Sequence, residues 1–251
     1  MNFENGDAHT LACRPFLITF SGIDGAGKST QIERLTASLQ NRGLRVTVLS
    51  FWDHVAVWSN MRSGVGYRAA DLLQPKQISE LPVPAKNHKH IRNWYLTAIR
   101  SAFYVLDVAR LRRLLRSRPI KSFDVVICDR YIYDQIANLY SKSPLTRLYM
   151  RALLHQSPRP DLAFILDTSP DAAFARKPEY PLDFMYRNRR SFLELRELAP
   201  ELLKISAGSA DEVEDQIQAH ISQSRLLKTP AHRAKAEISG GDHCSLLTEL
   251  P

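Results

Sequence analysis

Residues 16–31 read FLITFSGIDGAGKSTQ, and this stretch decides the fold class. The apolar run Phe16–Ser21 predicts a buried strand, and a helix is expected from Lys28 to about Arg42. Between them, residues 22–30 match the pattern G-x-x-x-x-G-K-[ST] in full. The glycines let the backbone curl so that N–H groups converge on an anion, and the following helix adds its positive end. A strand, this loop and a helix in succession predict a phosphate-binding loop.

Two side chains of this loop are expected to meet the phosphates and a metal ion directly. Lys28 can reach the β- and γ-phosphates of a nucleoside triphosphate, and the Ser29 hydroxyl suits Mg²⁺. The predicted ATP-binding residues of the loop are Gly22, Ile23, Asp24, Gly25, Ala26, Gly27, Lys28, Ser29 and Thr30. The motif specifies nucleotide binding, whereas the reaction has to be inferred from the rest of the chain.

Beyond the loop, short apolar runs alternate with amphipathic stretches. The patterns predict strands at residues 44–51, 123–129, 161–167 and 201–206, and helices at residues 90–116, 145–155, 170–177, 183–198 and 211–224. Strands separated by helices form parallel sheets that are covered on both faces, so the fold class is α/β. We expect a P-loop NTPase fold, a three-layer α/β/α sandwich with a five-stranded parallel sheet and a short lid at residues 177–182.

The chain is expected to form one kinase-sized domain with two loose ends. The domain is predicted at residues 15–225, after a leader at 1–14 and before a disordered tail at 226–251. The few, distant cysteines favour a reduced, cytoplasmic setting without disulfides. No apolar stretch approaches the roughly 18 residues that span a bilayer, so no membrane insertion is expected.

The net charge of +8 would attract any polyanion, so the distribution of charge has to decide its meaning. The basic run at residues 110–121 lacks interleaved aromatic residues. We interpret it as a solvated helix face and not as a nucleic-acid surface.

A second site element is the stretch VVICDRY at residues 125–131, where a carboxylate and a guanidinium follow a buried strand. Ligands of open α/β sheets bind outside the carboxyl ends of the strands. Asp129 is therefore expected near the loop, where it would hold Mg²⁺ or its water. Arg130 would fork onto an acceptor phosphate.

With these pieces in view, the chain resembles the thymidylate kinase family of nucleoside monophosphate kinases. The resemblance spans about residues 15–224 and is carried by the loop stretch, by VVICDRY, by PDLAFILDTSPDAAFARK at 160–177 and by DFMYRNRRSFLEL at 183–195. It implies transfer of a phosphoryl group from ATP, with Mg²⁺, to a small nucleotide, most simply dTMP. The family often forms dimers through its helices, so it also implies a homodimer in which the long helix at 90–116 takes part.

The resemblance assigns roles on the donor side and in the lid. Asp24 matches an acidic residue near the sugar hydroxyl of the acceptor, and Arg176 matches an arginine near the donor nucleotide. Gly25 stands where one subgroup carries a catalytic arginine, which implies the other subgroup, whose lid arginines stabilise the transferring group. The residues with an expected catalytic role are Asp24, Lys28, Arg130, Arg187, Arg189 and Arg190.

On the acceptor side the chain departs from the family pattern. Residues 51–54 read FWDH instead of a run like Arg-Glu-Pro-Gly, and an Asp-Arg pair is replaced by Asp107-Val108. Arg100 and Arg110 lie roughly on the helix face of Asp107, so either one is a candidate replacement. The predicted acceptor-binding residues are Trp52, Asp53, Arg100, Tyr104, Asp129, Arg130 and Tyr131.

Three other functions stay open from the sequence. The same fold could phosphorylate another nucleoside, nucleotide or small phosphorylated metabolite. A regulatory nucleotide-binding module is a second alternative, although no Asn-Lys-x-Asp base reader is present. A kinase of nucleic-acid ends is the third, and salt-dependent binding to single strands would reveal it.

Overall fold

A five-stranded parallel sheet forms the centre of the molecule, as the sequence predicts. The computed structural model describes residues 14–56, 89–139 and 143–227, with the side chains of residues 89–100 not described. The strands lie in the order β2-β3-β1-β4-β5. Their bounds are β1 Phe16–Ser21, β2 Val46–Ser50, β3 Val125–Asp129, β4 Leu162–Asp167 and β5 Leu202–Ser206. Every residue of β1 is buried, as expected of a strand covered on both faces.

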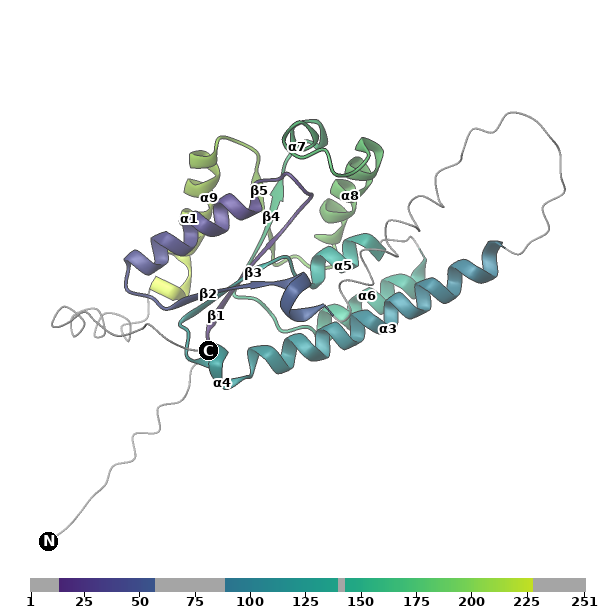
Figure 1. The fold of residues 1–251 in the computed structure, drawn as a ribbon, viewed down its shortest axis with the longest axis horizontal. Coiled ribbons are helices and arrows are strands. Elements are labelled where there is room, and N and C mark those ends of the chain that lie inside the picture. The colour runs from purple at the N-terminus through teal and green to yellow at the C-terminus, as the bar shows by residue number, and fades with distance from the viewer. Residues whose placement is uncertain (1–13, 57–88, 140–142, 228–251) are drawn as a thin grey trace, which may run out of the picture.

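Helices cover both faces of this sheet and complete the predicted α/β/α sandwich (Figure 1). One face carries α1 Lys28–Asn41 and α9 Ala210–Gln223, which pack against each other. The other carries α3 Lys89–Leu115, α5 Ile132–Leu139, α6 Pro144–Gln156 and α8 Leu182–Leu195. The short helix α7 Pro170–Arg176 packs against α8, and α4 Arg118–Lys121 follows α3.

Several element boundaries differ from the sequence prediction. The second strand ends at Ser50, because Phe51–Val55 form a single π-helical turn, η1, and not more strand. The helix α8 ends at Leu195, three residues earlier than expected. The helix α5 was not predicted. It is only eight residues long, and its polar residues Asp134 and Gln135 are buried together with its apolar ones.

The two ends of the described domain are both fixed to the sheet. Arg14 donates to Asp161 at 2.8 Å, and Leu226 lies 4% exposed in the 3₁₀ turn η2 Arg225–Leu227. The prediction of a tail from residue 226 therefore begins too early. Residues 1–13 and 228–251 lie outside the described residues, as does the connection at 57–88. Among the residues that are described, no helix has the length and apolar character needed to cross a membrane.

The strand register brings the predicted site residues to one edge of the sheet. Asp129 at the end of β3 is level with Phe20 in β1 and with Ser50 in β2. On the other side of β1, Ser21 is level with Ile165, two residues before Asp167 at the end of β4. The loop after β1, the turn after β2 and the Asp-Arg step after β3 therefore begin side by side.

Candidate active site

The phosphate loop has the backbone conformation that its glycines allow. The φ angles of Gly22, Gly25 and Gly27 are 140°, 80° and 88°. Gly27 caps the N-terminus of α1, so the positive end of that helix opens into the loop. This geometry fits the predicted cradle for the phosphates of a nucleotide.

Gly25 has a second constraint, which is steric. A Cβ at this position would lie well inside van der Waals distance of the carbonyl oxygen of Ala173 in α7. The backbone of α7 therefore packs directly against the loop where one subgroup of the resembled family carries an arginine. An arginine at position 25 would require the loop or α7 to move.

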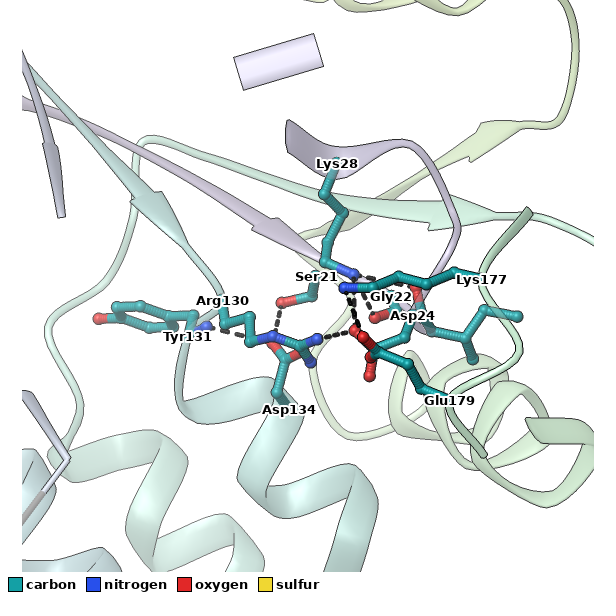
Figure 2. Close-up of polar contacts among 10 residues, drawn as sticks. Ser21, Gly22, Asp24, Lys28, Arg130, Tyr131, Asp134, Lys177 and Glu179 are labelled. Atoms are coloured by element: carbon teal, nitrogen blue, oxygen red, sulfur yellow. Dashed lines mark hydrogen bonds and ion pairs between the residues drawn. The ribbon is translucent and has the colours of Figure 1, made fainter. Parts of the chain in front are cut away.

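Lys28 lies folded into the loop. Its Nζ donates to the carbonyl oxygens of Gly22 and Ile23, each at 2.9 Å, and its side chain is 7% exposed (Figure 2). The pKa of Lys28 is lowered to about 8, chiefly by burial and also by the positive charge of Arg130, while three nearby aspartates act in the opposite direction. A bound phosphate would therefore stabilise the charged form of this amine.

A compact group of charged side chains surrounds Lys28. Arg130 donates from Nη2 to Asp24 and from Nη1 to Asp134 at 3.3 Å (Figure 2). Arg130 has a φ of 66°, the only positive φ of a non-glycine residue among those described. The sequence placed Asp24 and Arg130 in the site but gave no signal for Asp134, because Arg130 lies in the turn before α5 and not on the same helix.

Asp129 and Ser29 are the residues predicted to hold Mg²⁺. The Oδ1 atom of Asp129 is buried and has no hydrogen-bond partner among the described residues. An unpartnered buried carboxylate oxygen fits a metal-bound water or the ion itself. Within the described residues no group of three His, Cys, Asp or Glu side chains forms a metal site. Mg²⁺ is usually bound through one or two carboxylates together with substrate phosphates, and Asp129 could supply one such carboxylate.

The three arginines in the middle of α8 have different surroundings. Arg189 forms a bidentate pair with Asp167 at the end of β4, with Nε–Oδ1 and Nη2–Oδ2 distances of 2.5 and 3.0 Å. Arg190 pairs with Glu194 one turn along the helix. Arg187 is exposed, and no hydrogen bond or ion pair of its side chain is found within the described parts of the chain. Arg189 is thus held by Asp167 of the sheet, whereas Arg187 is available to a ligand.

Two further residues connect α7 and the lid to the loop. A Cβ on Gly27 would lie 3.9 Å from Nη1 of Arg176, so this guanidinium is close to the loop. In the predicted lid, Lys177 pairs with Glu179 at 3.1 Å. Figure 2 draws this pair in the same view as Asp24 and Lys28.

The predicted acceptor residues are only partly brought together. Trp52 and Asp53 lie on η1, directly beyond the strand end that is level with Asp129, and the ring of Trp52 packs edge-on against Phe51. Tyr104 is buried on α3, which packs against η1. The side chain of Arg100 lies outside the described residues.

Tyr131 does not fit its predicted place beside the acceptor. Its ring is fully buried in the core, and its hydroxyl donates to the carbonyl oxygen of Pro158. The sequence placed it at the site because it follows Arg130 directly. The positive φ of Arg130 turns the chain, so that Arg130 faces the site while Tyr131 enters the core. Val108, which replaces an arginine of the family pattern, is likewise buried.

Comparison with protein families matches residues 7–56 to the methylmalonyl Co-A mutase-associated GTPase MeaB. This match covers the phosphate loop and its neighbours and less than half of the chain. Individual relatives extend much further. A probable thymidylate kinase of Methanosphaera stadtmanae is 25% identical over 209 residues, which cover 81% of this chain and 96% of the relative. A thymidylate kinase of Chlorobaculum parvum is 31% identical over 172 residues, which cover 64% of this chain and 65% of the relative.

Solved structures show the same fold. The thymidylate kinase of Candida albicans superimposes with a TM-score of 0.55 at 21% identity, covering 85% of this chain and 93% of that one. At this identity the similarity establishes the arrangement of strands and helices. The assignment of site residues depends on the geometry described above.

Proposed function

We propose that this chain, which belongs to the thymidylate kinase family, transfers the γ-phosphoryl group of ATP to dTMP. An oxygen of the dTMP phosphate forms a bond to the γ-phosphorus as the bond to the β–γ bridging oxygen breaks, so the products are dTDP and ADP. The observation that carries this proposal is the phosphate loop with its buried Lys28 beside the Asp24–Arg130 pair at one sheet edge.

The protein contributes position and charge to this reaction. Loop N–H groups and Lys28 hold the donor phosphates, and Arg176 lies near them. Ser29 and Asp129 would hold Mg²⁺, which neutralises phosphate charge when it is bound. In-line transfer needs little covalent chemistry from the enzyme, so placing the two phosphates accounts for most of the catalysis.

On the acceptor side we assign the phosphate to Arg130 and the nucleoside to the surface beside η1. The guanidinium of Arg130 has five N–H groups and donates to Asp24 and Asp134, which leaves donors for a phosphate. Asp24 would accept from the sugar hydroxyl, and Trp52 and Asp53 follow β2, whose last residue is level with Asp129. Tyr104 on α3 would approach the base. In the lid, Arg187 is the arginine that would reach the transferring group.

The chain is further proposed to act on free nucleotides in the cytoplasm as a homodimer, with residues 15–225 as its catalytic domain. Apolar side chains are exposed on α3 at Val105 and Leu106, and on the adjacent helix α6 at Leu145 and Leu148. Their burial between two copies would be favourable. Sedimentation velocity should give a dimer that Leu148→Glu weakens, and a wild-type monomer at micromolar concentration would contradict this assignment.

The identity of the acceptor is tested by supplying the protein with Mg²⁺, ATP and one candidate acceptor at a time, and by measuring ADP release. The candidates are the common nucleoside monophosphates, the free nucleosides and a short single-stranded DNA. We expect rapid ADP release with dTMP and a matching amount of dTDP. Turnover of another acceptor with none of dTMP would contradict the proposed substrate, and ATP hydrolysis without any acceptor product would contradict the reaction.

A further inference from the structure

Asp134 in the first turn of α5 is a buried carboxylate that joins three parts of the site. Its Oδ2 accepts from the Ser21 hydroxyl at 2.7 Å and from the N–H of Tyr131 at 3.1 Å. Its Oδ1 accepts from Nη1 of Arg130 at 3.3 Å, and the side chain is 2% exposed (Figure 2). The three donors come from the last residue of β1, from the turn after β3 and from the Arg130 guanidinium.

We propose that Asp134 is a positioning residue that fixes the Arg130 guanidinium relative to the start of the phosphate loop. This inference rests on the proposed function, because it gives Arg130 its role toward the acceptor phosphate. Asp134 itself touches neither substrate. It acts by holding the side chain that does.

The backbone of Arg130 is strained. A φ of 66° is unfavourable for a non-glycine residue, so the surroundings have to hold it there. The N–H of Arg130 donates to Phe20 at 2.9 Å and that of Tyr131 donates to Asp134. Asp134 therefore supports both the strained turn and the guanidinium that leaves it.

The two carboxylates that flank Arg130 differ in their surroundings. Asp24 belongs to the loop and is 20% exposed, and an acceptor phosphate would compete with it for Arg130. Asp134 is enclosed and is held by Ser21 as well. When a phosphate draws one end of the guanidinium from Asp24, the contact to Asp134 keeps the other end in place.

All three partners of Asp134 are hydrogen-bond donors. A carboxylate accepts through both oxygens, whereas an asparagine amide has one acceptor and one donor group. In Asp134→Asn, one donor would face another donor, and Arg130 would lose the negative charge that opposes the pull of Asp24. The guanidinium should then shift toward Asp24.

The test is a double-mutant cycle of Asp134→Asn and Arg130→Ala with dTMP and ATP as substrates. We expect Asp134→Asn to lower kcat/KM for dTMP by about 10- to 100-fold, as for a hydrogen bond to a charged group, with the KM for ATP within about twofold of wild type. In the Arg130→Ala background the same change should cost less than about threefold, since its target is gone.

Asp161 provides a matched control at the opposite edge of the sheet. It is also a buried carboxylate, and it accepts from a backbone N–H, that of Leu17, and from Arg14 and Arg225. Asp161→Asn should lose a similar amount of stability in urea but leave both KM values unchanged. Ser21→Ala, which leaves all charges in place, should lower kcat/KM for dTMP by a few-fold, and only where Arg130 is present.

Equal losses from Asp134→Asn with and without Arg130 would overturn the positioning role while leaving dTMP phosphorylation intact. If Asp134→Asn does not fold, the same additive behaviour of Ser21→Ala would overturn it. A wild-type protein that does not phosphorylate dTMP would overturn both this role and the proposed function.

Discussion

The donor side and the acceptor side of the site differ in how they are built. The donor side consists of the loop at residues 22–30, closed by the packing of α7 against Gly25. The acceptor side combines η1, the helix α3 and the step from Asp129 to Asp134, which are far apart in the sequence. One side is thus specified by a continuous motif and the other by tertiary packing. A substitution on the donor side is expected to affect the use of ATP, and one on the acceptor side the use of dTMP. Substitutions should therefore distinguish the two sides.

The largest effect is expected from Lys28→Ala on the donor side. Loss of a charged contact to the transferring group should lower kcat by on the order of 10³-fold. The urea midpoint should not fall, because the variant no longer buries an amine whose pKa burial lowers. Lys121→Ala, on the exposed face of α4, is the control and should keep full activity. Near wild-type turnover by Lys28→Ala would contradict the role of Lys28 toward the phosphates of ATP.

The steric closure of the loop is tested by a pair of glycine substitutions. Gly25 and Gly43 have φ angles of 80° and 78°, but a Cβ on Gly43 would meet no atom within 4 Å. Gly43→Ala should cost only the backbone strain of about 1 kcal/mol. Gly25→Ala should cost roughly 1–3 kcal/mol more in urea unfolding, because the backbone of α7 has to move. It should also weaken ATP binding, and equal losses in the two variants would show that α7 does not close the loop.

The protonation of Lys28 gives the donor side a pH dependence of its own. With a pKa of about 8 in the free protein, the amine loses its charge as pH rises above that value. Bound phosphates favour the charged form, so ATP binding is strongest below about pH 8 and should weaken by up to tenfold per unit above it. Calorimetric titration with ATP at increasing pH measures this slope. A flat profile for the wild type between about pH 7.5 and 9.5 would contradict the assignment.

The smallest effect belongs to the acceptor side, at Trp52. Its ring is partly buried and packs edge-on on Phe51, next to the expected acceptor surface. Trp52→Leu should raise the KM for dTMP by about 3- to 10-fold, the worth of one aromatic contact, and leave the KM for ATP unchanged. A change in the KM for ATP alone would place Trp52 on the donor side and contradict its assignment to the acceptor side.

The same contrast explains what could be predicted from the sequence. The parallel five-stranded sheet and the phosphate loop follow from apolar runs and one motif, and the structure confirms both. The helix α5 was missed because it is short and follows the Asp-Arg step directly, and Asp134 was missed with it, since the burial of its carboxylate depends on tertiary packing. Tyr131 was misplaced because the positive φ of Arg130 cannot be read from the residue type. These features depend on packing between distant segments.

Phosphoryl transfer to dTMP is tested most directly by following the γ-phosphoryl group itself. ATP labelled with ³²P in the γ-position is mixed with dTMP, Mg²⁺ and an excess of enzyme for a single turnover, and the products are separated. We expect the label to leave ATP and to appear in the β-phosphate of dTDP in equal amount. Label that stays in ATP, or that is released as inorganic phosphate while dTMP is unchanged, would contradict the central claim.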